Sequence, residues 1–200
     1  MTNASGPLTG IRVVDLTTAV SGPVAAVILA DQGADVIKIE PPGGDFMRAA
    51  GPKSGMNPTF VACNRGKRSI VLDLKQQGAA EILWRLIESA DVLIQNFRPG
   101  AIERLGFGAS TVAARNPRLV YLSISGVGES GPYSGKRVYD PVIQALGGLA
   151  DIQADPQTGR PRMVRTLIAD KTTAVYAAQA VVAALFSRER TGVGQHVRLS

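Results

Sequence analysis

Asp170 is the residue of this sequence best placed for covalent chemistry, because it directly precedes a long alanine-rich apolar segment, Lys171 to Ser187. A carboxylate in the first turn of a helix faces unpaired backbone N–H groups and the positive end of the helix dipole. Both favour the ionised form, which acts as a nucleophile or a base. The same position suits an ordinary N-cap that accepts hydrogen bonds from the amides of Thr172 or Thr173. Spacing alone leaves both roles open.

Histidine and cysteine, two other common catalytic side chains, each occur once, as His196 and Cys63. His196 stands in a predicted strand, where we expect it to pack or to cap rather than to transfer protons. A Ser-His-Asp triad or a zinc site therefore has almost no side chains to draw on. Any chemistry in this chain is expected to rest on carboxylates and backbone donors, without a metal.

Two segments that follow predicted strands have the composition of anion-binding loops. Thr17 to Pro23 places Ser21 as the expected cap of the next helix, but the segment does not match the dinucleotide motif GxGxxG. Asn96 to Gly100 follows a later strand. Arg98 in this segment and Arg104 beyond it have the geometry to pair with phosphates, although a solvated surface arginine is the commoner case for each.

Strand and helix signals alternate along the chain. This alternation predicts an α/β fold with a doubly wound, Rossmann-like, mostly parallel sheet flanked by helices. Segments 41–65 and 126–138 interrupt the alternation with glycine, proline and polar residues, and we expect them to carry function. Residues 196–200 have the pattern of a further strand, so we expect the fold to continue beyond Ser200. The predicted strands are 11–16, 35–40, 68–74, 91–96 and 119–125, and the predicted helices are 24–32, 77–89, 110–116 and 171–187.

The composition is that of a globular protein with a moderate basic excess. Of the 200 residues, 45% are hydrophobic and 19% charged, and the formal net charge is +6. The basic residues are scattered and aromatic residues are few, so the chain lacks the basic tract and stacking platform typical of nucleic-acid binding. A small polyanionic ligand fits this charge better. We see no secretory signal and no membrane span, and we expect a cytoplasmic protein.

Several segments together resemble one family, the class III (CaiB/BaiF-type, formyl-CoA transferase-like) CoA-transferases, in their N-terminal half. The similarity runs in order from about Pro7 to Ser200, which makes it specific. The segments that carry it are Pro7 to Leu16 with Ser21-Gly22-Pro23, Gly33 to Pro42, Asn64 to Lys75, Asp91 to Gly100 with Arg104-Leu105-Gly106, Tyr139-Asp140, and Asp170 at the start of its helix.

The resemblance implies a reaction and a set of site residues. Asp170 takes the position of the family's catalytic aspartate, which attacks an acyl-CoA thioester and forms mixed-anhydride and aspartyl-CoA intermediates while CoA passes to a second carboxylic acid. Tyr139 takes a position beside the reacting centre. Coenzyme A is then a substrate, and no tightly bound cofactor is implied. The residues expected to line the CoA site are Val20, Leu72, Lys75, Asn96, Phe97, Arg98, Arg104 and Arg137.

The sequence also departs from the family pattern. Some transferases carry a glutamine at the position of Val20, so acid specificity is expected to differ here. Family chains are longer, form an interlocked homodimer, and carry a small domain and a C-terminal return to the large domain. We therefore expect residues 1–200 to be the N-terminal part of the large CoA-binding domain, without the small domain and the C-terminal return on which activity depends in the family.

Two other functions stay open on the same residues. An α-methylacyl-CoA racemase of the same fold would need a histidine at the position of Tyr139, and a tyrosine is a poor base at neutral pH. A non-catalytic CoA-binding fragment would bind CoA without forming a covalent adduct at Asp170.

Overall fold

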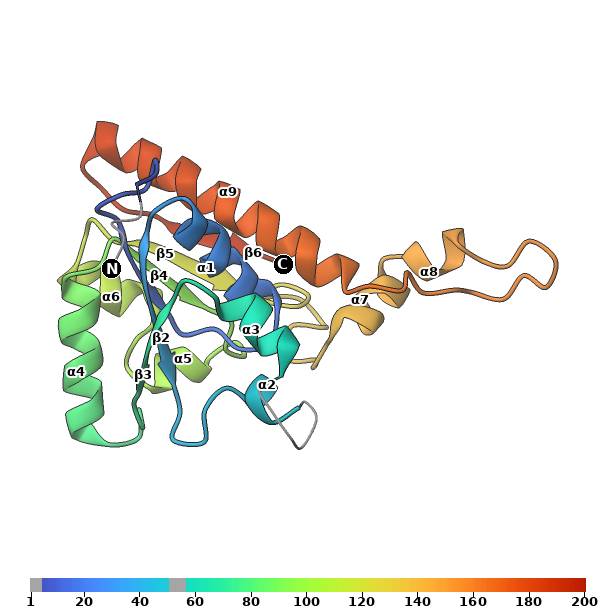
Figure 1. Ribbon diagram of the computed structural model, residues 1–200, viewed down its shortest axis with the longest axis horizontal. Helices are drawn as coiled ribbons and strands as arrows, with labels where there is room; N and C mark the ends of the chain where they lie inside the picture. The colour runs from blue at the N-terminus through green and yellow to red at the C-terminus, as the bar shows by residue number, and fades with distance from the viewer. Residues whose placement is uncertain (1–4, 51–56) are drawn as a thin grey trace.

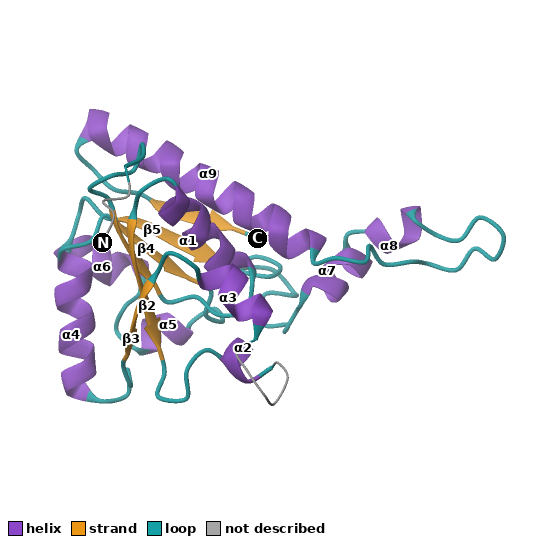
Figure 2. Cartoon of the chain, viewed as in Figure 1, coloured by secondary structure: helices purple, strands orange, loops and turns teal. Residues whose placement is uncertain are grey.

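Parallel strands form one sheet at the centre of the computed structural model, which describes residues 5–50 and 57–200 (Figures 1 and 2). Within these residues the six strands lie in the order β3-β2-β1-β4-β5-β6, and every pair is parallel. The predicted doubly wound sheet is therefore confirmed. The strands are β1 (Arg12–Asp15), β2 (Asp35–Glu40), β3 (Arg68–Val71), β4 (Val92–Gln95), β5 (Val120–Ile124) and β6 (His196–Leu199).

The strand order reverses between β1 and β4, which are neighbours in the sheet although β2 and β3 lie between them in sequence. At such a switch point the loops after the two strands diverge to opposite sides and leave a crevice at the carboxyl edge of the sheet. The loop after β1 is the segment Thr17 to Val20, and the loop after β4 is the segment Asn96 to Gly100. The topology thus brings both predicted anion-binding loops to one place.

Helices cover both faces of the sheet. They are α1 (Ser21–Asp31), α2 (Phe46–Ala49), α3 (Pro58–Asn64), α4 (Gln77–Glu88), α5 (Ala101–Arg104), α6 (Ala109–Arg115), α7 (Asp140–Leu146), α8 (Leu149–Ile152) and α9 (Ile168–Thr191).

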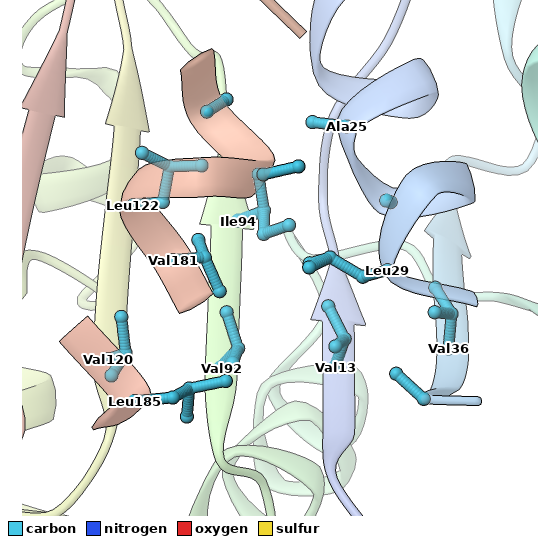
Figure 3. Packing of buried hydrophobic residues seen from close by; sticks show 14 of the residues in the cluster. Val13, Ala25, Leu29, Val36, Val92, Ile94, Val120, Leu122, Val181 and Leu185 are labelled. Carbon is cyan, nitrogen blue, oxygen red and sulfur yellow. The ribbon is translucent and has the colours of Figure 1, made fainter. Parts of the chain in front are cut away.

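Alternate residues of each strand point to the two faces, as a pleated strand requires. Val13, Val92 and Val120 belong to the core beneath α1 and α9, which Figure 3 shows in close-up. The residues that follow them in sequence belong to the opposite core, where α4, α5 and α6 contribute Leu83, Ile102 and Val112.

Alanines allow α1 and α9 to pack closely against each other. Ala25 and Ala26 of α1 are buried, as are Ala174, Ala177 and Ala178 of α9. Small side chains at a helix contact shorten the distance between the two axes. The N-terminal end of α9, which carries Asp170, consequently lies beside the N-terminal end of α1 (Figure 1).

The four predicted helices are present, although α9 is longer at both ends than predicted, and the sequence did not predict α5, α7 and α8. α1 begins at Ser21, so its N-cap is Val20, and the prediction that Ser21 caps this helix is wrong. Two short helices, α2 and α3, lie within segment 41–65, which the sequence predicted only as an interruption; residues 51–56 of that segment lie outside the described residues. Asp45 and Asn57 cap them by accepting hydrogen bonds from Met47 and Thr59.

The segment that contains α7, α8 and the loop leading to α9 projects from the body of the molecule (Figure 1). Several of its large apolar side chains are exposed, and Ile152 is 80% exposed. Across the two described ranges, no helix combines the length and apolar character needed to cross a membrane. The same residues contain no cluster of three or more potential metal ligands from His, Cys, Asp and Glu.

Candidate active site

A cavity of about 700 Å³ opens at the switch point of the sheet. Its walls come from the loops after β1 and β4, the end of β5, the segment 134–143 and the first turns of α9. Six of the predicted site residues lie in this lining: Asn96, Phe97, Arg98, Arg137, Tyr139 and Asp170. Residues distant in sequence are therefore gathered around one volume that is large enough for part of a drug-sized ligand.

Asp170 is the third residue of α9 and half-buried at the cavity wall. The N-cap of α9 is Leu167, so the alternative that Asp170 is an ordinary N-cap is wrong, whereas its position in the first turn is confirmed. The carboxylate faces the start of α1 instead. Ser21, the first residue of α1, lies close enough for its hydroxyl and its backbone N–H to act on this carboxylate, and both lower its pKa. The positive ends of α1 and of α9 therefore both lie near the Asp170 carboxylate.

The pKa of Asp170 is raised, chiefly by burial and next by the negative charge of Asp140, while the two Ser21 interactions oppose this shift. The expectation that helix position alone would favour the ionised carboxylate is therefore corrected, because desolvation and a like charge outweigh the donors. A carboxylate with a raised pKa is more basic once ionised, and basicity increases its strength as a nucleophile.

Asp140 holds the backbone beneath this carboxylate. It is buried at the start of α7, and its Oδ2 accepts a hydrogen bond from the backbone N–H of Asp170 at 3.0 Å. Its Oδ1 accepts from Nε2 of Gln144 at 2.6 Å. Gln144 in turn accepts from the backbone N–H of Val164 at 2.8 Å. These contacts fasten the chain that enters α9 to α7.

Asp140 was not among the predicted site residues. The signal was present, since an acidic residue followed by proline is typical of a helix start. Its neighbour Tyr139 is the N-cap of α7, and the Tyr139 side chain is 68% exposed and lines the cavity. This pattern does not indicate that the Asp140 carboxylate accepts a hydrogen bond from the first turn of α9.

The loop from β1 to α1 is tightly packed. Only glycine fits at position 22, because an added Cβ would lie 2.4 Å from Cγ2 of Thr17. Ala19 adopts a φ of 67°, a backbone conformation that residues other than glycine rarely adopt and that costs energy. Strain of this kind at a cavity wall is common at functional sites.

Buried charges support this loop from below. Lys67 donates through Nζ to Oδ2 of Asp15 at 2.8 Å and to the carbonyl of Pro23 at 2.8 Å. Lys38 is fully buried and donates to the carbonyl of Thr17 at 2.7 Å. Burial acts to raise the pKa of Asp15, but the two lysines lower it overall, so this carboxylate is held ionised. The buried lysines were not among the predicted site residues.

Two arginines are placed to meet an anionic ligand. Arg98 and Arg137 are exposed at the cavity, and within residues 5–50 and 57–200 neither forms an ion pair. Phe97 is half-buried between them and the core on the α4 side. A cation beside an apolar wall is the combination that a nucleotide phosphate and its base require.

The other four predicted site residues lie outside the lining of this cavity, as far as the described residues define it. Val20 is buried as the N-cap of α1, and Leu72 is buried in the core on the α4 side. Lys75 is exposed in the turn that precedes α4, and Arg104 ends α5 next to Gly100. Their roles toward CoA stay predictions.

His196 lies in β6 and not at the cavity. Its Nε2 is 2.8 Å from Oγ of Ser123, and its ring packs edge-on against Tyr121. Burial lowers the pKa of His196, which favours the neutral ring. The expectation that this histidine packs within the sheet is confirmed.

Comparison with known proteins identifies relatives of this chain. The model of CoA-transferase family III matches residues 8–200. The chain is 43% identical over 197 residues to an acetyl-CoA:oxalate CoA-transferase of Acetobacter aceti, covering 98% of this chain and 51% of that protein. It is 41% identical over 209 residues to a succinate–glutarate CoA-transferase of Agrobacterium fabrum (strain C58), covering 100% of this chain and 52% of that protein.

A solved structure shows the same fold. The crystal structure of a CaiB/BaiF family protein from Brucella suis superposes with a TM-score of 0.92 at 40% identity, covering 96% of this chain and 52% of that one. The chain thus spans about half the length of the relatives it matches. Because the family model and these relatives match it almost from end to end, the chain belongs to CoA-transferase family III.

Proposed function

We propose that this chain carries the nucleophile of an acyl-CoA:carboxylic acid CoA-transferase, with Asp170 as the residue that forms the covalent intermediates. The observation that carries the proposal is the setting of Asp170. Its carboxylate lies at the wall of a cavity, has a raised pKa, and faces two donors from Ser21 at the start of α1. Membership of CoA-transferase family III supports the same assignment.

In the first half of the reaction, an oxygen of the Asp170 carboxylate attacks the carbonyl carbon of the acyl-CoA thioester. The C–S bond breaks, CoA leaves as a thiolate, and a mixed anhydride joins the acyl group to Asp170. The thiolate then attacks the aspartyl carbonyl carbon. The donor acid leaves as a carboxylate, and Asp170 becomes an aspartyl-CoA thioester.

The second half reverses these steps with a different acid. The acceptor carboxylate attacks the aspartyl carbonyl, releases the CoA thiolate and forms a new mixed anhydride. The thiolate attacks the acyl carbonyl of that anhydride, which gives the new acyl-CoA and restores the Asp170 carboxylate. No proton is consumed in the complete exchange, so the cycle needs no histidine base.

The donors of Ser21 have a defined task in this cycle. Each attack on the aspartyl carbonyl places negative charge on an oxygen of Asp170, and a fixed N–H and O–H at that oxygen stabilise it. A donor that stabilises such a developing charge is worth about 10²-fold in rate or more. Tyr139 is placed beside the same volume, where its hydroxyl is available to the incoming acid.

Arg98 and Arg137 are assigned to the phosphates of CoA, and Phe97 to the adenine or the pantetheine arm. The acids are small carboxylates, as the names of the relatives from Acetobacter and Agrobacterium indicate for those proteins. The homodimer that the resemblance implies and the cytoplasmic location expected from the sequence belong to this proposal as well.

Racemase chemistry has less support. It would need a second acid–base residue opposite Asp170, and the single histidine of this sequence is bonded to Ser123 in the sheet.

Intact-mass analysis tests the proposal directly. The protein is mixed with acetyl-CoA, succinyl-CoA or oxalyl-CoA, and Asp170→Asn serves as the matched variant because the amide keeps the shape of the side chain. An acyl or CoA adduct on the wild type alone supports Asp170 as the nucleophile and names the donor. The test is repeated on a chain extended beyond Ser200 to the length of the relatives. Absence of an adduct on both forms would overturn the covalent mechanism.

A further inference from the structure

Hydrogen bonds from other parts of the chain anchor both ends of the segment that carries Ser21, residues 17–23. Asp15 accepts a hydrogen bond from the backbone N–H of Thr17 at 2.9 Å, and Lys38 donates to the carbonyl of Thr17. Lys67 donates to the carbonyl of Pro23. Five residues, 18–22, lie between these two anchored ends. For the first three of them, Thr18, Ala19 and Val20, only one side chain from elsewhere in the described sequence forms a hydrogen bond.

That side chain is Asn96, the first residue after β4. Its Oδ1 accepts from the backbone N–H of Thr18 at 3.0 Å, and its Nδ2 donates to the backbone carbonyl of Thr18 at 2.9 Å. The side-chain amide thus engages both backbone groups of one residue, as a neighbouring strand would do. It joins the two loops that diverge from the switch point.

The residue next to this contact is the strained one. Ala19, with its φ of 67°, directly follows Thr18 and directly precedes the turn into α1. A conformation of this kind costs energy and persists only where the surroundings fix it. On the N-terminal side of Ala19 the paired hydrogen bonds of Asn96 fix Thr18, and on its C-terminal side the carbonyl of Val20 accepts from the backbone N–H of Val24 within the first turn of α1.

We propose that Asn96 is a positioning residue: by clamping Thr18 it holds Ala19 in its strained conformation, and so directs the N–H and hydroxyl of Ser21 toward the Asp170 carboxylate. This inference rests on the proposed function for its catalytic consequence. It gives Asn96 a task different from the one inferred by resemblance, in which the side chain contacts CoA. Both polar atoms of the amide are already engaged with Thr18, so contact with CoA would have to use their remaining hydrogen and lone pair.

The test compares Asn96→Ala with Asn116→Ala. Asn116 is a matched control because its Nδ2 also donates to backbone carbonyls, those of Ile87 and Ala90 at 3.0 Å each, far from the cavity lining. The first readout is the rate of adduct formation as a function of acyl-CoA concentration. The second is the titration of the Asp170 carboxyl carbon by NMR, assigned by its absence from Asp170→Asn, which requires no turnover.

We expect Asn96→Ala to lower the saturating rate by about 10- to 100-fold, since small misplacements of catalytic groups have effects of this size. The acyl-CoA concentration at half-saturation should change by less than about twofold. The pKa of Asp170 should rise further, because Ser21 lowers it in the wild type. Asn116→Ala should change stability without changing the rate or the titration.

A rise in the half-saturating concentration at an unchanged saturating rate would mean that Asn96 contacts CoA, and would overturn the proposal. An Asp170 titration unaltered by Asn96→Ala would overturn it independently of catalysis. If the wild type forms no adduct but its titration responds to Asn96→Ala, the proposed function fails while the positioning role stands.

A second variant keeps the test informative if Asn96→Ala folds poorly. Glycine adopts a positive φ without strain. Ala19→Gly in the Asn96→Ala background should therefore restore part of the rate and of the Asp170 titration. A double variant no better than Asn96→Ala in both readouts would contradict the link between Asn96 and the strained residue.

Discussion

The N-terminal ends of α1 and α9 each lie beside a carboxylate from another element, and the two carboxylates differ in their surroundings. Neither helix has a side-chain cap of its own, because the N-cap residues are Val20 and Leu167. Each is served instead by a carboxylate from a different element: Asp170 at α1, and Asp140 at α9. Both residues line the cavity, but Asp140 is only 3% exposed and each of its carboxylate oxygens accepts a hydrogen bond from a protein donor, whereas Asp170 is half-buried. We therefore expect the enclosed carboxylate to serve the structure and the more accessible one to meet the substrate.

The largest expected effect follows from removing the reactive carboxylate. Asp170→Asn should reduce transfer activity by roughly 10⁴-fold or more, as loss of a covalent nucleophile does. It should leave the fold intact because the amide has the same shape. Steady-state transfer of CoA between two acids measures this, and a variant with more than a tenth of wild-type activity would refute the assignment.

Asp140→Ala should lower the stability of the fold and also change the pKa of Asp170. It leaves the N–H of Asp170 without its acceptor and removes the shortest of the hydrogen bonds that the Gln144 amide donates, which costs about 1–3 kcal/mol of unfolding free energy. It should also lower the pKa of Asp170 by removing a nearby negative charge. Urea unfolding and NMR titration test both effects.

Asp155→Ala is the matched control for that variant, because Asp155 accepts from backbone N–H groups of Gln157 and Thr158 in the projecting segment. Its substitution should leave the Asp170 titration unchanged. Equal responses to the two variants would mean that Asp140 has no special connection to the site.

Ser21→Ala sharpens the comparison by removing one of the two donors at the reactive carboxylate. The pKa of Asp170 should rise, since the hydroxyl lowers it in the wild type. Transfer activity should fall by about 10-fold or more, less than for Asp170→Asn, because the backbone donor stays in place. Unchanged activity would assign the donor role to the backbone N–H alone.

The smallest expected effect is a pH dependence of stability. The pKa of Asp170 is raised in the folded protein, so its contribution to stability is full below the pKa of the unfolded chain. That contribution is lost as pH rises through the folded pKa. Wild type should therefore become less stable relative to Asp170→Asn over this window. A difference in unfolding free energy that stays constant from pH 4 to pH 8 would contradict the raised pKa.

Local patterns predicted the strands well and the caps poorly. The β-branched segment around Val13 and Val14 specifies a buried strand by itself, and the alanine-rich segment after Asp170 specifies a helix that packs closely. A cap depends on which side chain reaches a helix end in three dimensions. Ser21 and Asp170 each had the right residue type for capping, yet each interacts with the other instead.

The amino-acid sequence by itself determined the doubly wound order of elements, the place of Asp170 in a first helical turn, and the positions that resemble a CoA-transferase. These follow from residue type and short-range spacing. The tertiary structure decided that Asp170 faces Ser21, that Asp140 lies beneath it, that Lys38 and Lys67 are buried under the loop, and that Asn96 is bonded to Thr18. Each of these depends on burial and on contacts between distant segments. Desolvation and the field of a neighbouring charge arise only when the folded chain excludes water and brings those segments together.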